Sequence, residues 1–150
     1  KNISFVFSLE ENIDEIKAED VIKQEEVRLK KIVTDTGLIN ENTEDKELIE
    51  DFIITTDSFI AYRPSFGLHT IIAGYPWFLD WGRDSLIAFE GLLLKTKRFD
   101  IAKEVLLTFI RDIKYGLVPN GYSGYDNRPL YNSADASLLL FEEIKKLDQN

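Results

Sequence analysis

The feature that most constrains the fold is an alternation of helix types in the second half of the sequence. Residues 84–94 are apolar almost all the way round, as is a segment that begins at Ser133 or Asp135; this pattern is typical of buried helices. Between them, a segment that begins at Asp100 and ends at Gly116 carries its apolar residues on one face. This order predicts two layers of helices, with an inner layer wrapped by an outer one.

The first half of the sequence predicts a mixture of extended and helical segments. Residues 3–9 are rich in β-branched and aromatic side chains, which indicates one short strand. An acidic helical segment follows and leads into a helix that ends near Gly37. Residues 48–60 carry a second helical stripe, and residues 69–73 are expected to be extended.

Composition and charge narrow the classes of partner. The net charge is −9, and the acidic excess lies within residues 1–60, whereas residues 61–150 carry equal numbers of acidic and basic side chains. A neutral, aromatic-rich region without a basic stripe argues against nucleic-acid binding and suits a neutral ligand. No apolar run is long enough to cross a bilayer, so we expect no membrane partner.

Cysteine and histidine usage bears on cofactors and on the compartment. The chain has no cysteine and one histidine, His69, so it offers neither disulfides nor a histidine-rich metal site. We expect a packing role for His69, no metal, no cofactor and a cytoplasmic location. Lys1 stands in place of an initiator methionine and leads straight into an apolar stretch, so we also expect residues 1–150 to belong to a longer chain.

Two polar and aromatic clusters occupy equivalent places, each in a loop before a predicted buried helix. Residues 75–84 read YPWFLDWGRD, and residues 125–135 read YDNRPLYNSAD. The loops that enter successive inner helices emerge at the same end of a layered helical fold. Both clusters are therefore expected to face one shared pocket.

The residue types in these clusters suit a sugar. A sugar ring presents an apolar C–H face that stacks on tryptophan or tyrosine, and an edge of hydroxyl groups that pair with carboxylates, amides and arginine. Asp84 and Asp135 are available carboxylates near helix N-termini, where capping is the competing explanation. Likewise, Trp77 and Trp81 fit a core, and Arg83 fits a local ion pair with Asp84.

A longer, ordered set of motifs adds a resemblance. Its elements are TIIAGYPWFLDWGRDSLIAFEGLLLKTKRFDIAKEVLLTFI, then GLVPN, then YNSADASLLLF. Over residues 45–141 this set resembles the amylo-α-1,6-glucosidase domain of glycogen debranching enzymes. The resemblance implies an all-α fold of the six-hairpin glycosidase type, a partial (α/α)6 barrel preceded by a short N-terminal strand and a connecting helix.

The resemblance also implies a domain division, a substrate and a site. Residues 1–44 would form the strand and linker helix at the junction with an upstream β-rich domain, and residues 45–150 the first helices of a truncated catalytic barrel. The substrate would be α-1,6-linked glucose at branch points of glycogen or limit dextrin. The residues expected to line the terminal-glucose subsite are Trp81, Arg83, Asp84, Tyr131, Asn132 and Asp135.

By the same resemblance the catalytic residues are unknown, because the general acid and the general base are expected outside this chain. Residues 1–150 alone are therefore expected to be inactive, and to form a homodimer if isolated, since apolar helix faces would be exposed. Two alternatives remain open. One is another (α/α)6 glycosidase, a glucoamylase or trehalase relative; the other is a non-catalytic helical module for carbohydrate binding or dimerisation.

Overall fold

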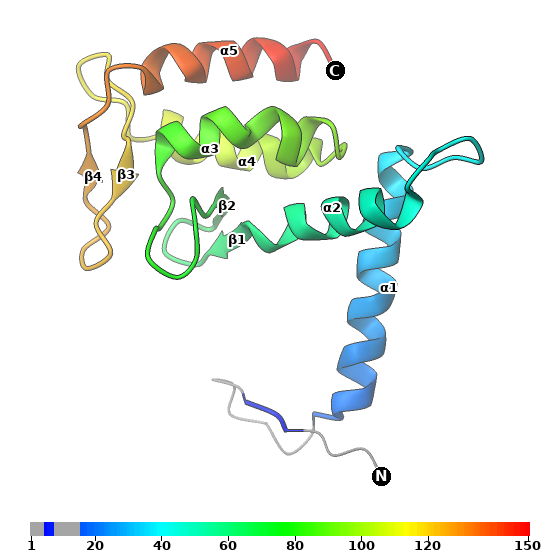
Figure 1. Cartoon of the computed structure of the whole chain (residues 1–150). Coiled ribbons are helices and arrows are strands. Elements are labelled where there is room, and N and C mark those ends of the chain that lie inside the picture. The colour runs from blue at the N-terminus through cyan, green and yellow to red at the C-terminus, as the bar shows by residue number, and fades with distance from the viewer. Residues whose placement is uncertain (1–4, 8–15) are drawn as a thin grey trace.

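The computed structural model describes residues 5–7 and 16–150, and helices dominate it (Figure 1). The α-helices in this part are α1 (Ala18–Thr36), α2 (Lys46–Ser58), α3 (Gly82–Phe89), α4 (Phe99–Ile110) and α5 (Ala136–Asp148). A π-helical turn, η2 (Glu90–Leu94), continues α3. Among the described residues, no helix is long and apolar enough to span a membrane.

Two antiparallel hairpins accompany the helices, so the fold is mostly rather than purely α-helical. Strand β1 (Ile60–Arg63) pairs with β2 (Leu68–Ile71), and β3 (Gly121–Tyr122) pairs with β4 (Pro129–Leu130). The prediction of an extended segment over residues 69–73 is confirmed for residues 69–71, which lie in β2. The helical prediction for Ile60 is wrong, because its backbone pairs with Ile71 in the first hairpin.

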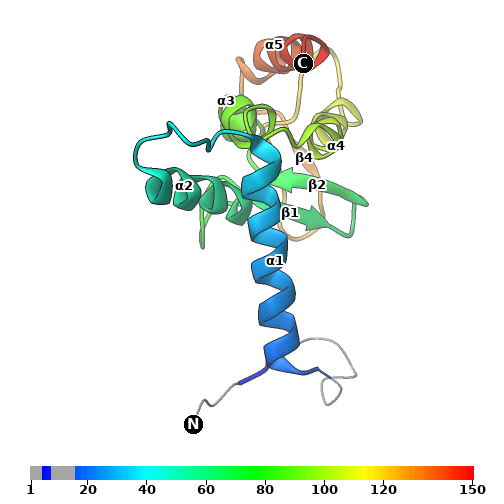
Figure 2. The same ribbon diagram turned by 90° about the vertical axis from the view of Figure 1, so that its right-hand side faces the viewer.

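Helices α3, α4 and α5 form the layered body of the molecule (Figure 2). α5 packs on α3 and α4, while α4 packs on η2 and on β2. The N-terminal ends of α3 and α5 lie at the same end of the body, beside the β3–β4 hairpin (Figure 1). The core that these elements share includes Ile71, Leu86, Phe89, Leu93, Val105, Phe109, Tyr122 and Leu140.

The sequence predicts a buried helix, then a helix with one apolar face, then a second buried helix. The order of these helices is confirmed, but the first and third are buried only on the side that faces the core. The side chain of Ile87 in α3 is 62% exposed, and those of Leu138 and Phe141 in α5 are more than 70% exposed. These two helices therefore each bury one side, although their sequences are apolar on nearly all sides.

The boundaries of α4 differ from those predicted. The helix begins at Phe99, so Asp100 lies in its first turn and Arg98 occupies the capping position. It ends at Ile110 and not at Gly116, because Gly116 is used in a later turn. There Tyr115 and Gly116 adopt positive φ, and Lys114 and Leu117 exchange both backbone hydrogen bonds around them.

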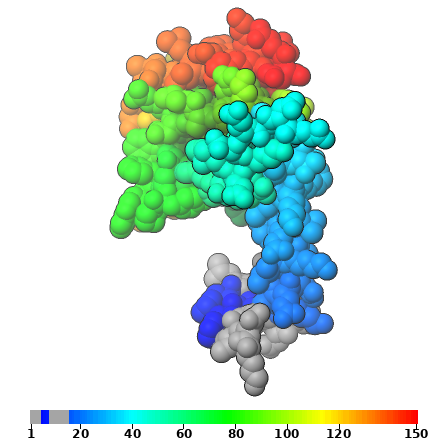
Figure 3. All heavy atoms as spheres, turned by 45° about the vertical axis from the view of Figure 1, so that its right-hand side comes forward, coloured from blue at the N-terminus to red at the C-terminus, as the bar shows by residue number. Residues whose placement is uncertain are grey.

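The N-terminal part stands apart from the body. α1 projects from it as a stalk and packs on α2 near its C-terminal end (Figure 3). α1 ends as predicted, with Gly37 in the left-handed conformation at φ 65°. The strand predicted for residues 3–9 lies mostly outside the described residues, and residues 5–7 carry no strand assignment.

Candidate functional site

A hollow of about 550 Å³ lies where the N-terminal ends of α3 and α5 meet. We call it the polar hollow; its lining is Trp81, Arg83, Asp84, Asn120, Asn132, Ser133, Ala134 and Asp135. Five of the six site residues predicted from the sequence lie in this lining. The expectation that the two loops face one pocket is confirmed, because residues of both loops line this hollow.

The sixth predicted residue, Tyr131, lies elsewhere. Its hydroxyl donates a hydrogen bond of 2.6 Å to the backbone carbonyl of Asp112, in the loop after α4. The ring thus ties the loop before α5 to the loop after α4, and the residue is absent from the lining of the polar hollow.

An ion pair crosses the polar hollow from one helix to the other. Arg83 Nε lies 3.0 Å from Asp135 Oδ2, and both side chains are about half exposed. The Ser133 hydroxyl donates a hydrogen bond to Asp135, and this bond, with the Arg83 charge, lowers the pKa of the Asp135 carboxyl below its ordinary value. Asp135 is therefore an ionised acceptor at neutral pH and is unsuited to be a general acid.

Neither aspartate acts as a side-chain helix cap. Asp84 is the third residue of α3, whose capping position belongs to Trp81. Asp135 occupies the capping position of α5 but makes no capping hydrogen bond with its side chain. Instead, the Ala136 N–H donates to the Ser133 hydroxyl at 3.2 Å. The carboxylate of Asp84 faces the hollow from the first helical turn, where the helix dipole favours negative charge.

Asn120 holds the two loops together and was missed by the sequence analysis. Its backbone carbonyl accepts the Gly82 N–H at 2.7 Å, and its side-chain oxygen accepts the Arg83 N–H at 3.1 Å. Its amide also donates to Asn132 at 3.2 Å. These bonds satisfy two of the free N–H groups at the start of α3 from a loop 37 residues away.

The contact at Asn120 is possible because residue 82 is glycine. A Cβ atom at Gly82 would lie 2.4 Å from the carbonyl oxygen of Pro119 and 3.2 Å from the Phe109 ring. The chain therefore needs glycine here for a close backbone approach, not for a positive φ. A glycine between Trp81 and Arg83 is the one sequence signal that could have revealed this contact.

A buried ion pair lies directly behind Trp81. Asp80 is 1% exposed, and its Oδ2 accepts hydrogen bonds from Arg63 and, at 3.3 Å, from the Thr70 hydroxyl. Arg63 also donates to Asn127 Oδ1 at 2.6 Å, at the tip of the β3–β4 hairpin. Arg63 thus links the first hairpin, the loop that carries Trp81 and the second hairpin.

A second hollow of about 410 Å³ adjoins the first and shares Trp81, Asn120 and Asn132 with it. We call it the aromatic groove. Its other lining residues are Trp77, Leu79, Gly121, Tyr122, Ser123, Gly124, Tyr125, Arg128 and Leu130. The polar hollow and the aromatic groove together form one continuous surface at the α3 and α5 end of the body.

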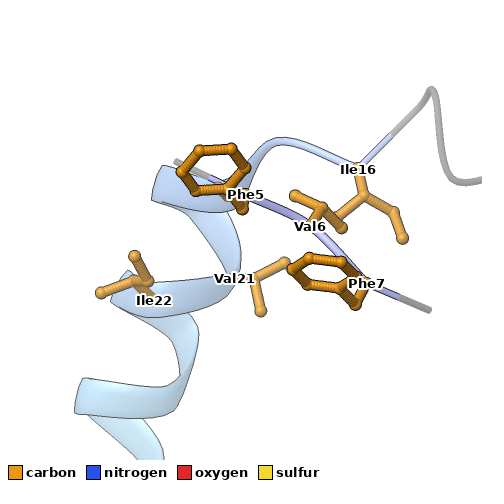
Figure 4. A pocket seen from close by; sticks show the side chains of 7 residues that line it. Phe5, Val6, Phe7, Ile16, Val21 and Ile22 are labelled. Atoms are coloured by element: carbon orange, nitrogen blue, oxygen red, sulfur yellow. The ribbon is translucent and has the colours of Figure 1, made fainter. Parts of the chain in front are cut away.

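A further hollow, of about 420 Å³, lies between residues 5–7 and the start of α1 (Figure 4). The described residues of its lining are all apolar: Phe5, Val6, Phe7, Ile16, Ala18, Val21 and Ile22. These described residues offer no hydrogen-bonding side chain to a ligand rich in hydroxyl groups.

His69 lies outside this surface. His69 in β2 contacts Glu104 of α4 through Nδ1 at 2.7 Å, which matches its expected packing role. Within residues 5–7 and 16–150, no group of three or more histidine, cysteine, aspartate or glutamate side chains could hold a metal ion.

Comparison with known proteins identifies the family. Residues 54–149 match the family model described as amylo-alpha-1,6-glucosidase, so the chain belongs to that family. Among individual proteins, it is similar to the glycogen debranching enzyme of Saccharomyces cerevisiae, with 37% identity over 87 residues. That similarity covers 55% of this chain but only 6% of the yeast enzyme. No solved structure matches this chain significantly.

Proposed function

We propose that this chain contributes the terminal-glucose subsite of an enzyme that hydrolyses α-1,6-linked glucose at the branch points of glycogen or limit dextrin. The observation that carries the proposal is the polar hollow, where Trp81 and the first-turn residues Arg83 and Asp84 of α3 meet Asn132 and Asp135 from the loop before α5. Family membership supports the reaction type.

The chemistry of the polar hollow fits one glucose unit. The Trp81 side chain is 40% exposed and offers an aromatic face for the C–H side of a sugar ring. Asp84 and the ionised Asp135 accept hydrogen bonds from hydroxyl groups, while Arg83 and Asn132 donate. One cation and two carboxylates also disfavour an anionic ligand in place of a neutral sugar.

The polar hollow binds substrate in this proposal and does not supply the catalytic pair. Glycoside hydrolysis needs a carboxyl group of raised pKa as general acid and a second carboxylate that activates water or attacks the sugar. The lowered pKa of Asp135 argues against the first role. We therefore assign the acid and the base to residues outside this chain and expect residues 1–150 alone to release no glucose.

The proposal extends to architecture and location. α3 and α5 would belong to the inner ring and α4 to the outer ring of an (α/α)6 barrel that starts near residue 45. Residues 1–44 would form the linker to an upstream domain. An isolated chain would associate through its exposed apolar faces, such as that of Phe141 and Leu138. The absence of cysteine suits the reducing cytoplasm.

Asp84→Asn in the full-length protein that carries this chain tests the subsite. Loss of a charged hydrogen bond to a sugar hydroxyl should lower kcat/KM for glucose release from limit dextrin about 10- to 100-fold, while the melting temperature falls no more than in the control variant Asp100→Asn. Asp100→Asn is the matched control, because Asp100 also lies in the first turn of a helix but is 98% exposed and outside the hollow.

Three outcomes would contradict the proposal. A loss of stability with little kinetic change would show that Asp84 acts only on its helix. Hydrolysis of maltose or trehalose in preference to branched dextrin would favour a glucoamylase-like or trehalase-like enzyme. Sugar binding without any hydrolysis by the full-length protein would favour a non-catalytic binding module.

A further inference from the structure

The aromatic groove has a composition distinct from that of the polar hollow. Trp77 is 85% exposed and Tyr125 is fully exposed, although large aromatic side chains are usually at least partly covered. Both rings lie in the lining with Trp81 and Leu79. Exposed aromatic side chains gathered in a hollow mark a surface that is covered when a ligand binds.

The polar groups of the groove indicate a neutral ligand. The described lining contains Arg128, Ser123, Asn120 and Asn132 but no acidic side chain. The single cation, Arg128, is already paired with Asp126 at 3.0 Å. The groove therefore offers flat apolar faces and a few donors and acceptors, which is the combination that a second sugar unit needs.

The groove is held in shape by contacts beneath it. The Trp81 ring meets Phe78 edge to face at a centroid distance of 6.2 Å. A Cβ atom at Gly124 would lie 3.2 Å from Leu79, so the tip of the β3–β4 hairpin already packs closely on the loop that carries the tryptophans. Arg63 anchors both loops from below, through Asp80 and Asn127. Such anchoring limits the entropy lost when a ligand is bound.

We propose that the aromatic groove binds the α-1,4-linked glucan chain that bears the branch, and that Trp77 and Tyr125 stack on its glucose units. This inference rests on the proposed function, in which the polar hollow holds the branch glucose. Because the two hollows share Trp81, Asn120 and Asn132, a chain that leaves the polar hollow across these residues enters the groove. The groove then makes the enzyme sensitive to the length of the main chain.

The test compares two substrates in the full-length protein: an α-1,6-glucosyl branch on maltose and the same branch on maltohexaose. The wild-type protein should show a lower KM for the longer substrate. Trp77→Ala and Tyr125→Ala should each raise KM for the longer substrate about 3- to 10-fold. For the shorter substrate, kcat and KM of both variants should stay within about 2-fold of the wild-type values. Tyr115→Ala is the matched control, because Tyr115 is 92% exposed and lies outside both hollows.

The outcomes separate this inference from the function on which it rests. Equal kinetics of the variants and the wild type on both substrates would overturn the role of the groove, as would an equal loss on both. A wild-type protein that releases no glucose from either dextrin would overturn the proposed function itself. Since both side chains are exposed, their removal should not unfold the protein, and melting temperatures within about 2 °C of wild type would verify this.

Discussion

Gly82→Ala tests the contact that joins the two loops of the site. The added methyl group would lie 2.4 Å from the Pro119 carbonyl oxygen and 3.3 Å from Asn120 Cα, so backbone atoms and not flexible side chains must move. The movement would also stretch the hydrogen bonds from Gly82 and Arg83 to Asn120. The start of α3 and the loop at Pro119 would separate.

The magnitude follows from these two effects. Overpacking in a close contact costs about 1–3 kcal/mol. Weakening two backbone donor bonds costs roughly 0.5–1.5 kcal/mol each. A helical glycine replaced by alanine regains about 1 kcal/mol of helix propensity. The expected net loss in the free energy of unfolding is about 1–5 kcal/mol.

Urea unfolding followed by circular dichroism measures this loss, with Gly91→Ala as the matched control. Gly91 is also helical, but a Cβ atom there would meet nothing within 4 Å. We expect Gly91→Ala to be neutral or to stabilise by up to about 1 kcal/mol. If the free energies of unfolding of Gly82→Ala and Gly91→Ala differ by less than about 0.5 kcal/mol, the close approach at residue 82 does not exist and the account of how the site is assembled is wrong.

Three further changes probe the contacts around the site. Asn120→Ala should lower kcat/KM for limit dextrin more than 10-fold. It should also lower the free energy of unfolding by about 2 kcal/mol, because the backbone N–H of Arg83 loses its acceptor. A variant with wild-type activity and wild-type stability would refute this. Asp80→Asn should cost about 3 kcal/mol in urea unfolding because it leaves Arg63 without its buried partner, and an unchanged midpoint would contradict the pairing. Burial raises the pKa of the Tyr122 hydroxyl above its ordinary value, so the stability that the protonated hydroxyl contributes is lost as pH rises above about 10. The free energy of unfolding of the wild type should exceed that of Tyr122→Phe by roughly 1 kcal/mol at pH 8, and this difference should shrink at pH 11. A difference that stays constant between pH 8 and pH 11 would show that the hydroxyl is not buried.

The layered helices and the meeting of the two loops were predictable from the sequence. Hydrophobic periodicity reports which residues face a core, and helix order then places the two loops at one end of the body. Asp84 and Asp135 stood out in these loops as available carboxylates, whereas the assignment of Arg83, Asp84 and Asp135 to a sugar subsite came from the family resemblance. The pattern failed where an apolar residue faces solvent, as at Ile87 and Phe141, because periodicity does not show what covers a helix.

The contacts that assemble the site were not predictable, since they join residues distant in sequence. Asn120 meets Arg83 across 37 residues, and Arg63 meets Asn127 across 64 residues. Nothing local in the sequence selects these partners, because asparagine and arginine side chains are most often exposed to solvent. Tyr131 shows the same limit: its residue type suits a sugar site, but its hydroxyl bonds to a backbone carbonyl away from the hollow.

The most direct test of the central claim is the product released by the full-length protein from two matched substrates. One is maltohexaose that carries a single α-1,6-linked glucose, and the other is linear maltoheptaose, which has the same number of glucose units. The account predicts one equivalent of free glucose from the branched substrate, with maltohexaose left intact, and none from the linear one. Glucose release from the linear substrate, or none from the branched one, would contradict it.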